Sequence, residues 1–181
     1  MSQVLRPSSL AESDGGWQAS QGTIPIVLSD QSDDTYAGPP TDGTAECNLL
    51  IDTGSSPAAG ARTLTVRCFD AGEALNLSGA LTVNLYQFGD PGDPQGTAVL
   101  QQTWEIGPNI GSSIADHNLT VTAPITDYGS LMVGLAASAW DNFPDLHVLD
   151  VYLTIPAAAA VASSIPARAE RADRCDRATR V

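Results

Sequence analysis

The chain has 181 residues, 43% of them apolar and 6% aromatic, and its net charge is −13 because 21 acidic residues outnumber eight arginines and there is no lysine. This length is enough for one domain with a hydrophobic core. Residues 1–166 hold three of the arginines and 18 of the acidic residues, a net charge of −15. This negative charge argues against nucleic-acid binding and against a basic membrane-binding surface in residues 1–166.

The chain begins with a polar segment, residues 1–23, which predicts a loose N-terminal arm or a peripheral first strand. From there to residue 156, apolar and polar residues alternate with period two, as they do in strands that bury one face. Turn-forming Gly, Pro, Asn and Asp residues separate the alternating segments. The predicted strands lie at residues 24–28, 45–52, 63–69, 80–86, 100–106, 119–125, 130–137 and 148–155.

About eight short strands without helical periodicity before residue 157 predict an all-β fold. The spacing favours an antiparallel β-sandwich of jelly-roll type over residues 24–156. The segment 130–137 (SLMVGLAA) is apolar on both faces, which predicts a central strand.

Residues 157–181 form an Ala- and Arg-rich C-terminal tail. Its arginines recur at every third position from Arg168 to Arg180, a step that spreads them around a helix instead of along one face. Because the tail has little apolar surface to bury, we predict that it is flexible or is ordered only by a partner. Its excess of positive charge suits an acidic neighbouring subunit.

The three cysteines, Cys47, Cys68 and Cys175, are an odd number without CxxC spacing. Cys47 and Cys68 fall in predicted strands, where we expect buried thiols; a disulfide between these two is the alternative. The N-terminal sequence lacks a secretory signal pattern, and no apolar run reaches membrane-spanning length. We therefore expect synthesis in a reducing cytoplasm, where the glycosylation patterns at Asn76 and Asn118 have no meaning.

Residues 49–57 (LLIDTGSSP) resemble the active-site motif of aspartic proteases, with Asp52 as the candidate catalytic residue. Those enzymes need two carboxyl groups that share a proton, and one motif per chain allows this only in a dimer. The segment 131–134 favours the dimeric, retroviral-like form, because it resembles the apolar-apolar-Gly segment of that family. Pro57 and the lack of a glycine-rich flap argue against it. We predict that Asp52 ends a strand, with the protease as a remote alternative.

Two groups of aspartates lie in predicted loops. Asp30, Asp33 and Asp34 offer oxygen ligands to calcium, but their spacing is not that of an EF-hand. A solvated turn is the simpler interpretation, and whether this loop binds an ion stays open. Asp90 and Asp93 flank Pro-Gly, which predicts a β-turn.

The two histidines also have acidic neighbours in the sequence. His117 follows Asp116, and His147 lies near Asp141 and Asp145. Neither histidine has zinc-binding spacing, and no serine lies in a nucleophile-elbow pattern. We predict no catalytic residue, no metal site and no cofactor.

Three tryptophans are candidates for a sugar-stacking platform. Trp104 alternates with apolar neighbours, so we expect it in the core. Trp140 lies in a predicted loop and is the better surface candidate, whereas Trp17 lies in the N-terminal segment.

Segments spread over residues 4–156 resemble those of known virion proteins. They include VLRPSSLAESDGGW, LSDQSDDTYA, LTVRCF, LTVNLYQFG, ITDYGSLMVGLAAS and LHVLDVYLTIP. The chain is similar in these segments to β-sandwich (jelly-roll) structural proteins of tailed bacteriophages, of the head-decoration or minor head type. The resemblance implies a non-enzymatic capsid decoration (cement) protein that binds the outer capsid surface and stabilises it.

The same resemblance implies the partners and the location. The expected partners are the major capsid protein or other virion proteins, and further copies of the chain in a homotrimer. The expected location is the virion, without nucleic-acid or membrane binding. A tail or fibre attachment module and a carbohydrate-binding β-sandwich are the alternatives.

Overall fold

The computed structural model describes residues 2–11, 16–39, 46–52, 60–71, 80–88, 97–107, 110–138 and 146–157. Most of the predicted tail, residues 158–181, therefore lies outside the described residues. The elements in chain order are β1 (Ser2–Leu5), β2 (Pro7–Leu10), β3 (Gln18–Ala19), α1 (Ile24–Val27), β4 (Ala37–Gly38), β5 (Cys47–Ile51), β6 (Arg62–Asp70), β7 (Ala80–Phe88), β8 (Ala98–Ile106), β9 (Ala115–Val121), β10 (Leu131–Ser138) and β11 (Leu146–Pro156).

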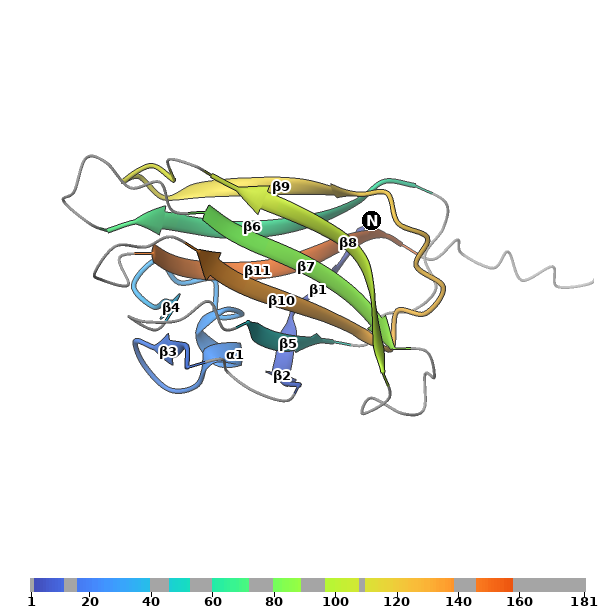
Figure 1. Ribbon diagram of the computed structural model, residues 1–181, viewed down its shortest axis with the longest axis horizontal. Helices are drawn as coiled ribbons and strands as arrows, with labels where there is room; N and C mark the ends of the chain where they lie inside the picture. Colours follow the sequence, from blue (N-terminus) through green and yellow to red (C-terminus); the bar gives the residue numbers. More distant parts are fainter. Residues whose placement is uncertain are drawn as a thin grey trace, which may run out of the picture.

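These strands form two antiparallel sheets that lie one over the other (Figure 1). Sheet A has the order β3-β4-β11-β6-β9, with β1 also paired to β11, and sheet B has the order β2-β5-β10-β7-β8. The orders β4-β11-β6-β9 and β5-β10-β7-β8 are the two four-stranded sheets of a jelly roll. The predicted jelly-roll sandwich is therefore confirmed.

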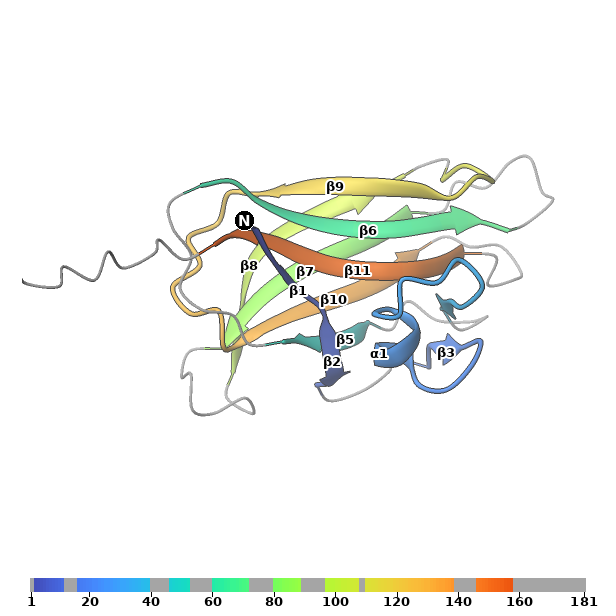
Figure 2. The ribbon, with the colours of Figure 1, turned by 180° about the vertical axis from the view of Figure 1, so that it is seen from behind.

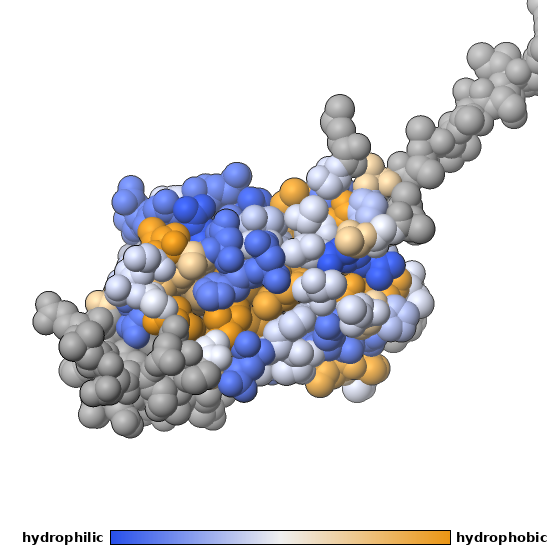
Figure 3. Space-filling view, turned by 90° about the horizontal axis from the view of Figure 1, so that it is seen from above, coloured by the Kyte–Doolittle hydropathy of each residue, from blue (hydrophilic) through white to orange (hydrophobic). Residues whose placement is uncertain are grey.

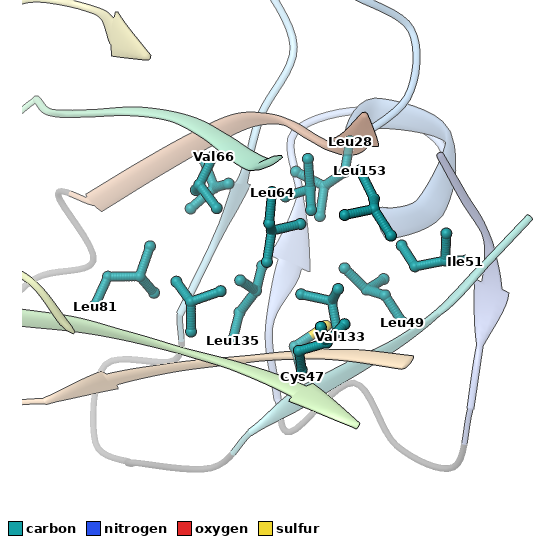
Figure 4. Packing of buried hydrophobic residues seen from close by; sticks show 14 of the residues in the cluster. Leu28, Cys47, Leu49, Ile51, Leu64, Val66, Leu81, Val133, Leu135 and Leu153 are labelled. Carbon is teal, nitrogen blue, oxygen red and sulfur yellow. The ribbon is translucent and has the colours of Figure 1, made fainter. Parts of the chain in front are cut away.

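The core lies between the sheets, where the inward side chains of both sheets meet (Figure 4). The alternation read from the sequence sets these faces: Leu64, Val66 and Cys68 of β6 are fully buried, and so are Leu81, Val83 and Leu85 of β7. Burial of each such aliphatic side chain stabilises the fold by roughly 1.5–3 kcal/mol. The odd-even pattern thereby also determines which side chains remain on the outer faces.

The predicted central strand at residues 130–137 is confirmed. It is β10, which pairs with β5 on one side and with β7 on the other. Both Met132, at 7% exposure, and Val133, at 0%, are buried although they point to opposite faces of the sheet. Met132 is thus enclosed by its neighbours although it points to the outer face of sheet B.

The N-terminal residues 2–10 belong to the sandwich, which corrects the expected boundary near residue 23. β1 pairs with β11 of sheet A, and β2 pairs with β5 of sheet B (Figure 2). Between these strands, Arg6 forms an ion pair with the buried Asp150 of β11. The sequence allowed a peripheral strand or a loose arm. The peripheral strand is correct, because backbone pairing and this ion pair fix the segment.

The predicted strand at residues 24–28 is wrong, because this segment forms the short helix α1. Thr23 precedes the helix in an extended conformation, and Pro25 lies in its first turn, where its missing N–H costs no hydrogen bond. Ile24 and Val27 are buried, whereas Ile26 is 59% exposed. An apolar run of this length looks the same in a buried strand and in one helical turn. Within the described residues no helix is long and apolar enough to span a membrane.

Candidate functional site

Asp52 directly follows β5 and is exposed. Its backbone N–H donates to the Arg6 carbonyl oxygen over 2.7 Å, which continues the contact between the N-terminal segment and sheet B. The segment 131–134 lies in β10, beside β5, with Met132 opposite Leu50. The prediction that Asp52 ends a strand is confirmed, while residues 53–59 lie outside the described residues.

Two of the three aspartates in the loop of Asp30, Asp33 and Asp34 have side-chain partners. Asp30 accepts hydrogen bonds from the Ser32 N–H over 2.8 Å and from the Thr35 hydroxyl over 2.6 Å. Asp33 pairs with Arg67 over 3.1 Å. These contacts build a turn, as predicted. Across the described residues no three or more His, Cys, Asp or Glu side chains are grouped to hold a metal ion. Asp90 and Asp93 lie outside those residues.

The histidines lie in two different settings. The ring of His147 stacks on that of Tyr36 with 3.5 Å between centroids, and Phe69 meets it edge-on at 5.1 Å. His117 of β9 borders a hollow of about 390 Å³ between the ends of β8 and β9. Burial lowers the pKa of His117, and the charge of Asp116 opposes that shift. Asp141 and Asp145 lie outside the described residues.

The cysteines and tryptophans have structural roles where they are described. Cys47 and Cys68 are buried and are not joined in a disulfide, as expected, and burial raises the pKa of Cys68 to about 12. Trp17 is 2% exposed and belongs to the core, and Trp104 packs partly buried against it. These two rings therefore form no stacking platform. Cys175 and Trp140 lie outside the described residues.

Sheet B carries a polar row across its outer face. By strand register, Asn48 of β5 lies opposite Gly134 of β10, Gly134 lies opposite Asn84 of β7, and Asn84 lies opposite Thr103 of β8. The inward neighbours of these residues fill the core, so the row points away from it. Four strands thus place three polar side chains and one glycine on a single line.

Gly134 leaves a hollow in the middle of this row, and the carboxylate of Glu46 fills it. A Cβ atom at Gly134 would overlap Glu46 Oε1 and would lie 2.5 Å from Glu46 Cδ. Contacts this short are not tolerated, so only glycine lets the carboxylate occupy this place. The same position is 3.0 Å from Asn48 Oδ1.

The carboxylate of Glu46 is held by neutral donors. It accepts hydrogen bonds from Asn84 Nδ2 over 2.8 Å and from the Tyr86 hydroxyl over 3.0 and 3.1 Å. Thr103 in turn donates to Asn84 Oδ1 over 2.8 Å. Burial, and then the contact with Glu46, raises the pKa of Tyr86 to about 12, so its hydroxyl stays protonated and donates. The residues Glu46, Asn48, Asn84, Tyr86 and Thr103 around Gly134 are named the Glu46 cluster.

An apolar row adjoins the Glu46 cluster. By register it consists of Leu50, Met132, Tyr86 and Leu100, of which Leu100 is 51% exposed. A polar row beside an apolar row can hydrogen-bond one edge of a ligand while its carbon face rests on the other. The outer face of sheet B is therefore the candidate binding surface.

The alternation over residues 80–86 puts Asn84 and Tyr86 on the solvent side of their strand, but it does not reveal the cluster. The sequence signals were Glu46 and Asn48, two polar residues two positions apart beside an apolar run, and a glycine inside a central strand. Only the register of four strands that are distant in sequence brings these residues together.

Comparison with known proteins gives little similarity. No protein-family model matches the chain, and no curated protein matches it. Among solved structures, a similar chain is the Clostridium thermocellum N-terminal endo-1,4-β-D-xylanase 10B, CBM22-1–GH10 modules, complexed with xylohexaose. The identity is 11% and the TM-score is 0.39, with 83% of this chain and 28% of that chain covered. The present chain thus spans less than a third of that chain's length, and the likeness carries no argument about function.

Proposed function

We propose that this protein is a carbohydrate-binding β-sandwich without catalytic activity, which holds a saccharide on the outer face of sheet B. The observation that carries the proposal is the Glu46 cluster: amide, carboxylate, phenol and hydroxyl groups lie over a glycine in the middle of a rigid sheet. Four strands fix its members, so a ligand pays little to order them.

The chemistry of the face suits saccharides. Sugar hydroxyls both donate and accept hydrogen bonds, and amide and carboxylate side chains offer matching partners. The C–H faces of sugar rings are apolar and can rest on the exposed end of the apolar row, where Leu100 is 51% exposed. Tyr86 belongs to both rows and presents a ring and a hydroxyl, the combination that makes tyrosine frequent at binding surfaces.

Affinity electrophoresis through gels that contain soluble polysaccharides tests this function. We expect the native chain to be retarded by at least one polysaccharide and Asn84→Ala to lose most of that retardation, because the mutation removes a donor to Glu46 and the partner of Thr103. Asn118→Ala makes the same chemical change on the exposed face of β9 in sheet A and should behave as the native chain. Equal retardation of both variants, or none of the native chain, contradicts the proposal.

A second proposal is the virion structural role implied by the sequence resemblance, with the major capsid protein and further copies of the chain as partners. The observation that favours it is exposed apolar surface on the edge strand β8, where Val99 is 54% and Leu100 is 51% exposed. Hydrophobic residues also reach the surface between hydrophilic ones on the side of the sandwich where β9 lies (Figure 3). Exposed apolar residues on an edge strand are typical of protein–protein contacts.

Light scattering and capsid sedimentation test the second proposal. A decoration protein is expected to form trimers or to sediment with phage capsids, and Val99→Asp should weaken whichever contact uses the β8 edge. Glycan binding through the Glu46 cluster should survive this substitution, because Val99 lies outside the polar row. A monomer that does not bind capsids would remove the virion role and leave the saccharide proposal standing.

A further inference from the structure

We propose that the Glu46 cluster selects saccharides that carry a free ammonium group, such as glucosamine units, over their N-acetylated and anionic counterparts. The inference rests on the proposed saccharide-binding function and names the ligand class for the same face. It follows from three features of the cluster: its hydroxyl donors are already used, one of its acceptors lacks a donor, and its charge has no cationic partner among the described residues.

The hydroxyl donors of the cluster are spent within it. The Tyr86 hydroxyl donates to Glu46, and the Thr103 hydroxyl donates to Asn84 Oδ1. Asn84 Nδ2 also donates to Glu46. Because a hydroxyl has one hydrogen, neither Tyr86 nor Thr103 can donate to a ligand without giving up its present partner.

One acceptor of the cluster lacks a donor. Asn48 Oδ1 is enclosed and has no hydrogen-bond partner in the part of the chain that the structure describes. Asn48 Oδ1 lies 3.0 Å from the Cβ position of Gly134, the hollow that the Glu46 carboxylate fills. A buried acceptor without a donor is unfavourable, so a ligand that supplies the donor gains from satisfying it. An ammonium group has three donors and no acceptor, and the Glu46 carboxylate can accept one of them at Oε2, which receives only the Tyr86 hydroxyl among the described donors.

The charge of Glu46 is balanced by no cation that the structure describes. The three arginines of the described residues are engaged elsewhere: Arg6 with Asp150, Arg62 with the Ala123 carbonyl and the Tyr128 ring, and Arg67 with Asp33 and Asp116. The partners of Glu46 are neutral groups. A cationic ligand therefore meets an unpaired charge, whereas a carboxylate or sulfate on the ligand meets repulsion.

The test is isothermal titration calorimetry with the full chain at low ionic strength, where charge effects are least screened. The probes are a glucosamine hexamer, the N-acetylglucosamine hexamer and a galacturonate hexamer. We expect the glucosamine hexamer to bind about tenfold more tightly than the N-acetylated hexamer, as one charge-assisted hydrogen bond would give. The galacturonate hexamer should not bind.

Glu46→Gln keeps the shape of the side chain and one acceptor oxygen, which can still receive the hydrogen bonds from Asn84 and Tyr86, and removes the charge. We expect this variant to bind the glucosamine and N-acetylglucosamine hexamers within about twofold of each other. Glu105→Gln is the matched control: it removes one carboxylate from β8 in the same sheet, opposite Thr82. The preference of this control should remain about tenfold.

Each result decides between separate claims. Equal affinity of the native chain for the glucosamine and N-acetylated hexamers overturns the inference and leaves saccharide binding intact. An equal loss of preference in Glu46→Gln and Glu105→Gln also overturns it, because the preference would then come from the net charge of −13. If no polysaccharide gel retards the native chain and the chain binds no hexamer, both the proposed saccharide-binding function and the inference are wrong.

Discussion

Two carboxylates of this protein are held in opposite ways. Asp150 of β11 is buried at the seam where the N-terminal segment joins the sandwich, and Arg6 pairs with it. Glu46 lies on the outer face of sheet B and is held by neutral donors. The charge of a buried carboxylate is neutralised within the protein when a cation pairs with it. A carboxylate held only by neutral groups can still pair with a cation from a ligand. The Arg6–Asp150 pair therefore stabilises the fold, whereas the Glu46 carboxylate is able to bind a ligand.

The largest expected effect is at the Asp150 seam. Arg6→Ala leaves a buried carboxylate without its cation, which we expect to lower the free energy of unfolding by about 3 kcal/mol. Urea denaturation at neutral pH measures this. Arg6→Ala combined with Asp150→Asn should recover a large part of the loss, because no unpaired charge remains. A double variant as unstable as the single one would show that Arg6 acts mainly through its contact with the Tyr152 ring.

The same pair gives a pH dependence of definite sign. Burial raises the pKa of Asp150 above its ordinary value, and Arg6 opposes that shift. A raised folded-state pKa contributes stability that is present below the ordinary pKa and is lost as the pH rises through the folded value. Without Arg6 the pKa rises further, so the deficit of Arg6→Ala should be large at pH 7 and shrink toward pH 4. A deficit that is equal at both pH values would contradict this account.

The next largest effect on stability is expected at Gly134, where the Glu46 carboxylate fills the hollow of the cluster. In Gly134→Ala the new methyl group displaces the Glu46 carboxylate and breaks its hydrogen bonds, which should lower stability by about 1 kcal/mol and abolish saccharide binding. Gly111→Ala is the control, because a Cβ there meets nothing within 4 Å. Thermal denaturation and affinity electrophoresis compare the two variants. Unchanged saccharide binding by Gly134→Ala would show that the hollow at Gly134 is not part of the binding surface.

Sequence patterns predicted the framework of this protein well. Period-two alternation identified seven of the eight expected strands and the inward faces of β6 and β7, because burial of alternate residues is a local property. The strand expected at residues 119–125 shows where that signal misleads. Burial still alternates through Ile125, but β9 ends at Val121. The amide of Gln102 accepts hydrogen bonds from the backbone N–H groups of Thr122 and Ala123 in place of a neighbouring strand.

The candidate site was not predictable in the same way. Glu46, Asn84 and Thr103 come from segments that are far apart in the sequence, and their meeting depends on the register of three strand pairs. A shift of one residue in any pair would turn the outward residues inward. Single aromatic residues were equally ambiguous, since Trp17 was a candidate for the surface and lies in the core.

A smaller, spectroscopic effect tests the contact between Glu46 and Tyr86. Glu46→Gln removes a negative charge next to the phenol, so the pKa of Tyr86 should fall from about 12 while burial still holds it above 10. Ultraviolet titration of the tyrosines reports it, and Tyr86→Phe identifies which transition belongs to this residue. An unchanged titration in Glu46→Gln would mean that the two side chains do not interact in solution.

The smallest effect is expected at Asp52, whose carboxylate is neither paired with a cation, as Asp150 is, nor held by neutral donors, as Glu46 is, within the described residues. It is exposed and follows β5, and its backbone N–H, not its side chain, contacts the Arg6 carbonyl. Asp52→Asn should leave the thermal denaturation midpoint, the molar mass and saccharide binding unchanged, because the substitution preserves shape and affects neither the Asp150 seam nor the Glu46 cluster. Loss of a self-cleavage activity in this variant would instead revive the dimeric protease. The Asp52 carboxylate is exposed and has no hydrogen bond or ion pair with the described residues, unlike those of Asp150 and Glu46, so it contributes little to stability.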